Sequence, residues 1–407
     1  MGIPWLEEYC GATIPIKRSY GLLLGKMVQP AAATENDVEV EYLNSASVQW
    51  HGINPDPEKT MWASPREIRS LAVTPGDLLI CEGGDVGRAA IYNGPPGRIF
   101  QNSVHRARSY QANDVRYLRY LLISLHRSGW LDVVCNKATI AHLTFEKLGV
   151  IEIPRFPVNE QRRIADFLDG ETARIDELVL LRNHQVDAFY KRLYCDSERD
   201  LKTEGQRVEL RRLIDTIQTG VTPTELLQPS ADNDEIPWYT PAALGGALDL
   251  NKADRSVRRD DVHNVPRFPS NSILIVGIGE SLGKVADLDH EATGNQQLTA
   301  IKTSSSVDRR FVAWQLFKAY EEIRAWAQYS RIRILSNDVL KTFKVSIPPI
   351  SQQVEQRRDL DHRLNSFRDF RNAAVRFSLL ASERKEALIT AAVTGQIDVT
   401  TARGGVA

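Results

Sequence analysis

The longest regular pattern of hydrophobic and polar positions lies between residues 351 and 397. Charged residues fill most of its positions, and hydrophobic residues recur every seven, with two more between them: Leu360, Phe367, Ala374, Ala381 and Leu388, with Leu364 and Phe377. A seven-residue interval that lasts for about four to five heptads is typical of a helix that packs lengthwise against another helix. At about 1.5 Å per residue, such a helix would be on the order of 50 Å long.

A second stretch, residues 158–200, carries a looser stripe of the same kind, formed by Ile164, Leu168, Ile175, Leu178, Val186, Phe189 and Leu193. Neither helix can bury its stripe alone. Two arrangements are open: each helix packs on its own domain, or the two pair antiparallel as a coiled coil. Their matched lengths favour pairing. The residues that we predict for helix pairing or partner contact are Ile164, Leu168, Ile175, Leu178, Leu360, Leu364, Phe367, Ala374 and Leu388.

Shorter patterns precede each long helix. Residues 76–92 alternate short apolar runs with glycine turns, which predicts strands and hairpins. Apolar residues then recur at helical spacing from Val115 to Leu125, up to Gly129, and the same pattern returns from Phe311 to Trp326. Each half of the chain is therefore predicted to be an α+β domain in which a sheet precedes a helix.

The two halves are copies of each other. Ile153-Pro154 and Glu160-Gln161 recur as Ile347-Pro348 and Glu355-Gln356, at offsets of 194 and 195. The turns Gly84–Arg88 and Gly279–Lys284, and the amide-rich steps Gln101–Val104 and Asn295–Leu298, repeat in the same way. So long a period indicates two whole domains in tandem, with an approximate internal twofold. The residues between these anchors mostly differ, as expected for binding loops on a shared scaffold.

This repeat predicts the domain organisation. We expect a first recognition domain at 1–157, a first long helix at 158–200, a second domain at 201–350, a second long helix at 351–397 and a flexible tail at 398–407. The fold class is α+β, with two tandem α/β domains joined by two long antiparallel coiled-coil helices. A chain of 407 residues is long enough for two separate cores.

Composition narrows the class of protein without choosing it. Lys and Arg total 51 and Asp and Glu total 52, so the net charge neither indicates nor excludes a polyanionic partner. Four cysteines without a CxxC pair suggest neither zinc nor a disulfide framework. The sequence contains no apolar run long enough for a membrane span, and its first residues lack the pattern of a signal peptide. We expect a cytoplasmic protein with no membrane contact.

Several motifs give the chain a family resemblance. An Ile-Pro step, a Glu-Gln pair and a long helix, found twice, resemble the DNA-specificity subunit of type I restriction-modification enzymes. Glu383–Asp398 is similar to that family's closing segment almost residue for residue, and Leu213–Pro223 and Ile236–Tyr239 open the second copy in the family's style. The resemblance covers nearly the whole chain, but departs from the family at residues 14–27 and 190–196.

The resemblance implies a non-catalytic protein of host defence that reads DNA. Its two target-recognition domains would each bind one half of a split, asymmetric double-stranded site, separated by about one duplex turn of roughly 34 Å or somewhat more. The long helices would dock modification (methyltransferase) subunits, two of them, and a restriction subunit would join to cut. This chain would bind no cofactor, whereas the partner subunits would use S-adenosylmethionine, ATP and Mg²⁺.

Side chains that would read DNA are predicted from their chemistry. Amides match the major-groove edge of adenine, whereas arginines suit guanine or phosphate, and lysines at glycine turns suit phosphate. Amides beside strands also bond to backbone in turns, glycine turns are often simple hairpins, and exposed arginines are usually solvated. The predicted DNA-binding residues are Arg88, Gln101, Asn102, Arg106, Lys137, Thr139, Lys284, Gln296, Gln297, Arg331 and Arg333.

Two other functions remain open. One is a stand-alone DNA methyltransferase or nuclease with an unrecognised motif, although Gly277-Ile278-Gly279 fits neither a dinucleotide fingerprint nor a P-loop. No histidine pair has metal-site spacing, so we predict neither a catalytic nor a metal site. The other is a coiled-coil assembly protein with no DNA role. The near-neutral charge also predicts that the lone subunit binds DNA weakly, with partners supplying many phosphate contacts.

Overall fold

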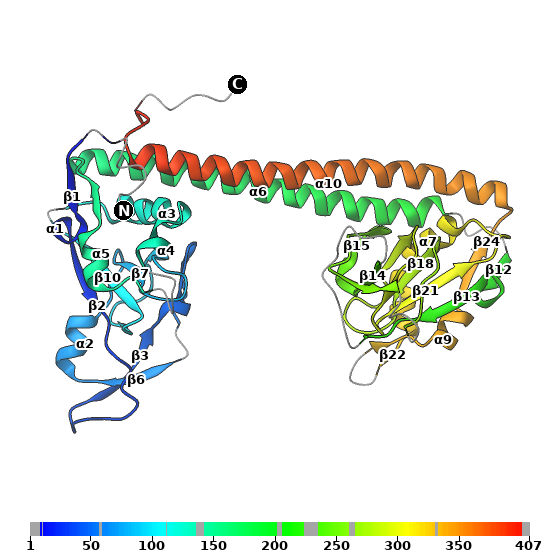
Figure 1. The fold of residues 1–407 in the computed structure, drawn as a ribbon, viewed down its shortest axis with the longest axis horizontal. Coiled ribbons are helices and arrows are strands. Elements are labelled where there is room, and N and C mark those ends of the chain that lie inside the picture. The colour runs from blue at the N-terminus through cyan, green and yellow to red at the C-terminus, as the bar shows by residue number, and fades with distance from the viewer. Residues whose placement is uncertain are drawn as a thin grey trace. The chain divides into compact units, whose positions relative to one another are not determined.

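The computed structural model describes residue 9 and residues 11–56, 59–110, 112–135, 142–201, 206–223, 235–259, 265–329 and 333–400. The chain divides into two compact units (Figure 1). Unit 1 comprises Met1–Leu180 with Phe377–Ala407, and unit 2 comprises Leu181–Arg376. Each unit therefore holds one globular domain and one part of each long helix.

Unit 1 is built on a four-stranded antiparallel sheet of order β2-β10-β7-β8 and a three-stranded sheet of order β6-β3-β9. Its globular elements are β1 Thr13–Pro15, α1 Ile16–Ser19, β2 Tyr20–Leu24, β3 Val38–Leu43, β4 Val48–Gln49, β5 Gly52–Ile53, β6 Thr60–Ala63, α2 Pro65–Leu71, β7 Leu78–Cys81, β8 Ala89–Ile91, β9 Ile99–Phe100, β10 Val104–Ser109, α3 Val115–Arg127, α4 Trp130–Val134, α5 Phe145–Val150 and β11 Glu152–Pro154.

Unit 2 repeats this topology. Its four-stranded sheet has the order β13-β21-β18-β19, and its three-stranded sheet the order β17-β14-β20. Its globular elements are β12 Gln206–Glu209, β13 Ile214–Thr219, β14 Glu235–Tyr239, β15 Leu244–Gly246, β16 Asp249–Leu250, β17 Arg255–Arg258, β18 Ser272–Val276, β19 Val285–Leu288, β20 Thr293–Gly294, β21 Leu298–Thr303, α7 Arg309–Lys318, α8 Tyr320–Trp326, β22 Gln328–Tyr329, β23 Arg333–Ile334, α9 Asn337–Thr342 and β24 Lys344–Ile347.

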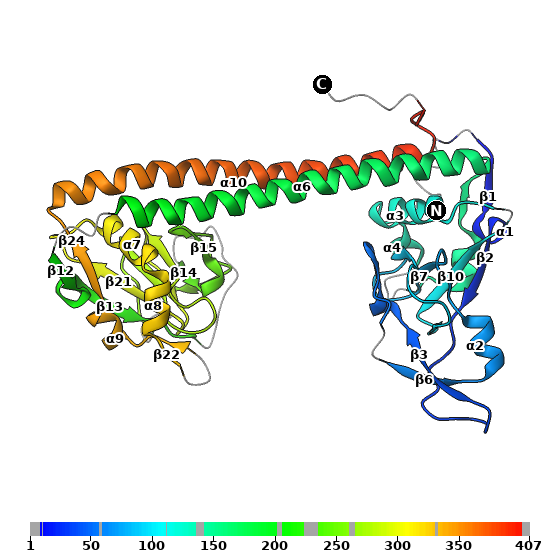
Figure 2. The same ribbon diagram turned by 180° about the vertical axis from the view of Figure 1, so that it is seen from behind.

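The core of each unit forms where its main helix covers the four-stranded sheet. In unit 1 the predicted helix is α3, which begins at an Asp114 N-cap and buries Leu118, Leu121, Leu122 and Leu125. In unit 2 the corresponding helix is α7, whose Asp308 N-cap accepts a hydrogen bond from the Phe311 N–H. Figure 2 shows α3 on the side of unit 1 that faces its long helices, with β3, β6 and α2 at the opposite end.

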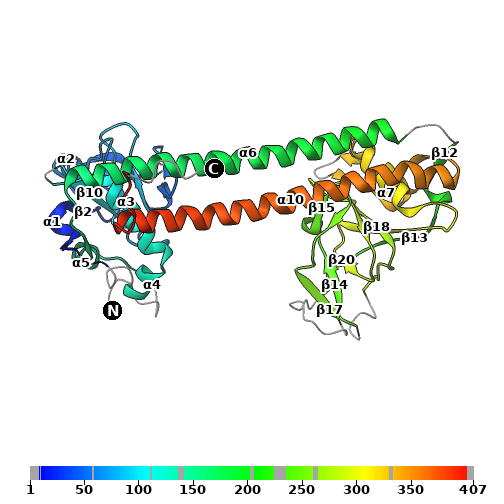
Figure 3. The ribbon, with the colours of Figure 1, turned by 90° about the horizontal axis from the view of Figure 1, so that it is seen from above.

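The long helices are α6, Val158–Asp200, and α10, Ile350–Val393. At about 1.5 Å per residue, the 43 residues of α6 extend about 65 Å, longer than the expected 50 Å. The two helices lie side by side within each unit (Figure 3). In unit 2, Phe189 contacts Phe370 and Phe367, and the later Asp196 pairs with the earlier Arg363. Helix pairing is therefore antiparallel, as predicted.

Most of the predicted pairing residues are buried. In unit 1, Ile164 and Leu168 share a core with Ile389, Ala392 and Val393, and Leu388 packs against that core. In unit 2, Leu360, Leu364 and Phe367 are buried together. Ile175 and Ala374 are also less than one tenth exposed.

The prediction that Leu178 packs in the helix pair is wrong, because its side chain is 46% exposed, and its contact with a partner subunit stays a prediction. After Ile175 the buried side of α6 continues through the partly buried Val179 and Arg182, four and seven residues later. Leu178 immediately precedes Val179 and so points about 100° away from it around the helix.

Each long helix also packs on the globular domain of its own unit. Asp169 of α6 accepts hydrogen bonds from Arg116 and from the Tyr120 hydroxyl, both on α3. Asp361 of α10 does the same for Arg310 and the Trp314 Nε1 on α7. Pairing and domain packing therefore coexist.

The starts of α6 and α10 make matching hydrogen bonds, but the residues that make them are not the ones that the repeated Glu-Gln pair aligns. Gln161 bonds the Asp114 N–H and the Phe156 carbonyl, and the residue that makes the matching bonds in unit 2, to Asp308 and Pro348, is Gln353. The repeated Glu-Gln pair instead matches Gln161 with Gln356. Three residues separate the repeated Ile-Pro step from α6, but only one separates it from α10, and this difference shifts the register.

Candidate nucleic-acid interface

The predicted amide-rich step forms the same tight turn in both units. The Val104 N–H donates to the Gln101 carbonyl at 2.9 Å, and the Leu298 N–H donates to the Asn295 carbonyl at 3.1 Å. Each turn connects the short strand that pairs in parallel with β3 or β14 to one of the two inner strands of the four-stranded sheet, β10 or β21. The turn is therefore a fixed point of the framework.

A glycine crosses each amide turn at close range. The Gly25 N–H donates to the Val104 carbonyl at 3.1 Å, and the Gly220 N–H donates to the Leu298 carbonyl at 3.0 Å. A Cβ at Gly25 would lie 2.2 Å from the Gln101 carbonyl oxygen, and one at Gly220 would lie 2.1 Å from the Gly294 oxygen. Both positions therefore require glycine. We call each glycine with the amide turn beneath it the glycine crossing of its unit.

The four predicted amides behave differently. Gln101 accepts a hydrogen bond from the Ser103 hydroxyl, and Gln297 bonds Asn295 and the Ile278 carbonyl, so both serve the turn itself. Asn102 is partly exposed, and its side-chain amide has no hydrogen-bond partner within the described part of the chain. Gln296 is exposed, and its Oε1 accepts from the Thr222 hydroxyl at 2.8 Å. Asn102 and Gln296 are the amides that a ligand can reach.

The second predicted feature is the hairpin turn that holds Arg88 and Lys284. The backbone bonds match: Cys81 N–H to the Arg88 carbonyl and Val276 N–H to the Lys284 carbonyl. The Lys284 side chain is exposed. By contrast, Arg88 folds inward, where its Nη2 donates to the Ser45 carbonyl at 2.8 Å and its Nη1 lies 3.5 Å from Asp85. Lys284 can therefore contact phosphate directly, whereas Arg88 would have to leave these partners.

Arg106 is the predicted DNA contact that the structure supports least. Its side chain is buried, donates to the Ser70 and Ala72 carbonyls, and lies over the Phe100 ring. Burial also lowers the pKa of its guanidinium. Arg106 thus joins β10 to the end of α2, and base contact by this residue would break that connection.

The remaining predicted contacts are less defined. Arg333 is partly buried in β23, and its carbonyl accepts from the Gly279 N–H. Lys137, Thr139 and Arg331 lie outside the described residues. DNA contact by the predicted residues therefore stays a prediction.

Sequence reasoning missed cations and apolar side chains close to the glycine crossings. Lys26 pairs with Glu67 of α2 at 2.5 Å, and the neighbouring Arg66 and Arg69 are exposed, without ion pairs in the described part of the chain. Met27 and Val221, which follow the two crossings, are 74% and 40% exposed. A polar or apolar pattern cannot single out these residues, because their exposure depends on long-range packing.

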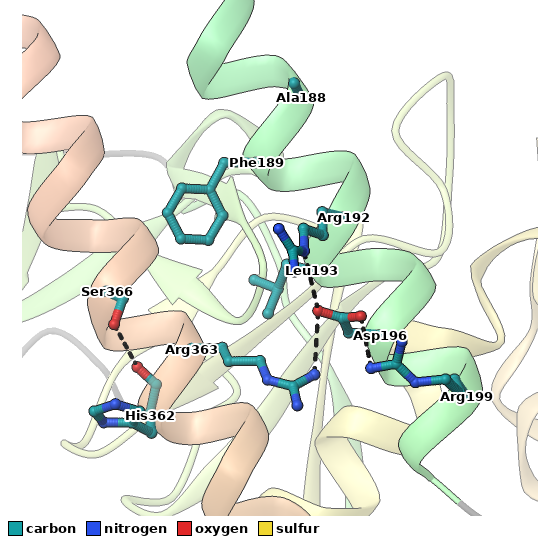
Figure 4. A pocket seen from close by; sticks show the side chains of 9 residues that line it. All are labelled: Ala188, Phe189, Arg192, Leu193, Asp196, Arg199, His362, Arg363 and Ser366. Carbon is teal, nitrogen blue, oxygen red and sulfur yellow. Dashed lines mark hydrogen bonds and ion pairs between the residues drawn. The ribbon is translucent and has the colours of Figure 1, made fainter.

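A pocket of about 590 Å³ lies between α6 and α10 in unit 2 (Figure 4). Arg199 and Arg363 lie 2.9 and 3.1 Å from Asp196, and Arg192 lies 4.0 Å from it. Arg363 also pairs with Asp200. The surrounding guanidinium groups thus balance the negative charge of Asp196. The ion pairs of Arg363 with Asp196 and Asp200 connect α10 to α6.

Exposed hydrophobic residues gather along the middle of the long helices. In unit 1 they are Leu178, Leu180, Leu379 and Leu380, and in unit 2 they are Leu181 and Val375, all between 46% and 62% exposed. Within the described residues, no helix is both long and apolar enough to cross a membrane. Nor does that part of the chain contain a group of three or more His, Cys, Asp or Glu residues that could hold a metal ion.

Two copies of an α/β domain, each with a glycine crossing and a share of an antiparallel helix pair, define a tandem-repeat class of protein. The family model for the type I restriction modification DNA specificity domain matches residues 66–179 and 207–365. The chain belongs to this family.

The chain is also similar to a named relative. A Haemophilus influenzae chain named as a putative type I restriction enzyme specificity subunit, S.HindORF215P, is 24% identical over 265 residues. That match covers 62% of this chain and only 65% of the relative.

Two solved structures share the fold. A chain from a structure on complex assembly and conformational transition of the type I R-M system has a TM-score of 0.69, at 14% identity over 95% of this chain and 98% of that one. The HsdS subunit from Thermoanaerobacter tengcongensis has a TM-score of 0.50, at 15% identity over 93% and 97%.

Proposed function

We propose that this chain is the DNA sequence-recognition subunit of a type I restriction-modification complex, and that each unit reads one half of a bipartite, asymmetric DNA site. One observation carries the proposal: the same framework is built twice and presents different side chains at the same place. Asn102 in unit 1 corresponds to Gln296 in unit 2, and Lys26, which follows Gly25, corresponds to Val221, which follows Gly220. Identical readers would favour a palindrome, whereas unlike readers favour two different half-sites.

The chain itself would carry out no bond-breaking step. Its contribution is to bind DNA and to position it for partners, and S-adenosylmethionine, ATP and Mg²⁺ would be used by those partners. The charge balance fits this division of work, because 51 basic and 52 acidic residues provide little general attraction for phosphate. Partner subunits would supply much of the phosphate contact.

The exposed hydrophobic residues of the long helices would dock the modification subunits. Isolated exposed leucines are ordinary, but several on one helical stretch are typical of a protein interface. Leu379→Asp combined with Leu380→Asp should prevent co-purification of a modification subunit while leaving the melting temperature nearly unchanged. Retained co-purification would show that docking occurs elsewhere.

Methylome mapping tests the main proposal. A host that expresses this chain with a type I modification subunit should acquire methylated adenines within one bipartite motif, and a host that lacks the chain should not. Methylation without sequence preference, or none at all, would contradict the proposal.

Two simple measurements address the other possible functions. Methyl transfer or cleavage by the purified chain alone, supplied with DNA and S-adenosylmethionine, would indicate a stand-alone enzyme. Complex binding that is unchanged when the motif is scrambled would indicate an assembly protein.

A further inference from the structure

We propose that the chain segment that leaves each glycine crossing contacts DNA bases, with Met27 in unit 1 and Val221 in unit 2 as its apolar contacts. This inference rests on the proposed function and assigns part of the reading to two residues outside the predicted set. The occupant is the major groove of duplex DNA, and the group contacted is an apolar base edge such as the thymine methyl.

Exposure is the first observation. Met27 is 74% exposed, the highest value among the large hydrophobic side chains of the described residues, and Val28 beside it is 42% exposed. Val221 is 40% exposed in unit 2. A single exposed hydrophobe is common on protein surfaces. Both lie within two residues of a glycine crossing, Met27 two residues after Gly25 and Val221 one residue after Gly220, and this shared location indicates a shared use.

Rigidity is the second observation, because a reading side chain must be held in place. The Lys26 N–H donates to the Phe100 carbonyl at 3.0 Å, and the Lys26 carbonyl accepts from the Asn102 N–H at 2.9 Å. In unit 2 the Val221 carbonyl accepts from the Trp238 Nε1 at 3.1 Å. Met27 and Val221 therefore follow or occupy backbone that the framework fixes.

The loop that follows Met27 is fixed as well. Asp37 accepts hydrogen bonds from Gln29, from the Ala33 N–H and from the Thr34 hydroxyl. The Gln29 carbonyl in turn accepts from the Trp62 N–H of β6. Met27 thus projects from a segment that is anchored on both sides.

The polar surroundings fit DNA. In unit 1, the Asn102 backbone N–H donates to the Lys26 carbonyl, and its side-chain amide has no partner among the described residues. Arg66 and Arg69 lie on either side of Glu67, the partner of Lys26. In unit 2, Gln296 bonds Thr222 beside Val221, and Trp238 pairs across the sheet with the exposed Arg255. An apolar contact, an amide and cations together match a thymine methyl, an adenine edge and phosphates.

The test uses Met27→Ala and Val221→Ala in the full chain, each assembled with a modification subunit and selected against a randomised duplex DNA library. Each variant should lose discrimination at one or two base positions of one half-site only, the two variants affecting opposite halves. Binding to the wild-type site should weaken about tenfold, as expected for the loss of one base contact. Val150→Ala is the matched control, because Val150 is 55% exposed at the end of α5.

The outcomes separate the proposed function from this inference. If the wild-type complex enriches no sequence, the proposed function fails and this inference fails with it. If the wild-type enriches a bipartite motif and both variants return the same motif and affinity, the proposed function stands and the inference is overturned. A uniform loss of binding with a lowered melting temperature would also overturn it, because that result marks a structural role.

Discussion

In each unit, a single glycine decides whether the chain can cross the amide turn without a collision. Gly25 and Gly220 lie where the chain crosses a carbonyl at a distance that leaves no room for a side chain. Gly170, in contrast, lies within α6, and a Cβ there would have no neighbouring atom within 4 Å. Replacing glycine with alanine is therefore expected to have opposite effects on stability at the crossings and within α6.

Gly25→Ala and Gly220→Ala should each destabilise their own unit by about 1–3 kcal/mol, because the methyl group would collide with backbone. Gly170→Ala should stabilise the chain by up to about 1 kcal/mol, since alanine is the better helix former. Urea denaturation of the three variants measures the difference. Equal effects at all three positions would show that the crossings are not tight.

A buried histidine gives unit 1 a dependence on pH. His105 is fully buried on β10, its Nε2 bonds the Leu143 carbonyl at 2.8 Å, and burial lowers its pKa. Glu82 and Glu146 lie near enough to offset part of that effect. The imidazole is therefore neutral in the folded protein at neutral pH.

Because the folded pKa lies below the unfolded value of about 6.5, the unfolded state takes up the proton first, and stability falls as pH drops below that value. Each pKa unit of difference corresponds to about 1.4 kcal/mol. Amide hydrogen exchange in unit 1 should accelerate between pH 7 and 5, after correction for the intrinsic exchange rate, and His105→Gln should remove part of this slope. His51→Gln, at an exposed position, is the control.

At the scale of elements, helix pairing depends on which residues face the partner helix. Ile175→Ala should cost about 2 kcal/mol or more, because it removes buried aliphatic contacts. Leu178→Ala should change stability by less than about 0.5 kcal/mol, since that side chain is largely in solvent. Thermal denaturation of the two variants tests which residue faces the partner helix. A larger loss of stability for Leu178→Ala than for Ile175→Ala would contradict the assignment of Ile175 to the buried side.

Elements were the level at which the sequence was most informative. A seven-residue interval specifies α10 and a looser stripe specifies α6, and the spacing from Val115 to Leu125 specifies α3, because burial repeats with the helical period. The register in which the starts of α6 and α10 correspond was harder to predict from the sequence. The Glu-Gln pair recurs in the sequence, yet Gln353 rather than Gln356 makes the bonds of Gln161, because two connections differ in length.

The site was predictable only in outline. Position in the repeat predicted that the two amide turns match in structure, but the accessibility of each side chain depends on partners distant in sequence. Arg106 and Arg88 are held by carbonyls 34 and 43 residues away, which no local pattern reveals. Met27 could not be predicted for the converse reason, since a methionine after a strand is typical of a buried position.

At the scale of the whole molecule, unit 1 is assembled from two separate stretches of chain. Its core includes Ile389, Ala392 and Val393 of α10 and also Val399, and Ile397 packs against it. Gly395, with φ of 72°, ends the helix in a left-handed conformation that lets the chain turn back onto this core. The final helical turns thus belong to the first domain.

Ile397→Ala with Val399→Ala should therefore loosen unit 1, through about 2 kcal/mol or more of lost burial, and leave unit 2 unchanged. Hydrogen exchange resolved by peptide can separate the two responses. Gln396→Ala, at an exposed neighbour, is the control. Equal loosening of both units would contradict this organisation.

The order of synthesis follows from this arrangement. The ribosome makes residues 181–376 as one uninterrupted stretch, so unit 2 has all its parts before the chain is finished. Unit 1 begins first but must wait for residues 377–400 to emerge, and in the meantime its nascent hydrophobic surface stays uncovered. The domain translated first is therefore completed last.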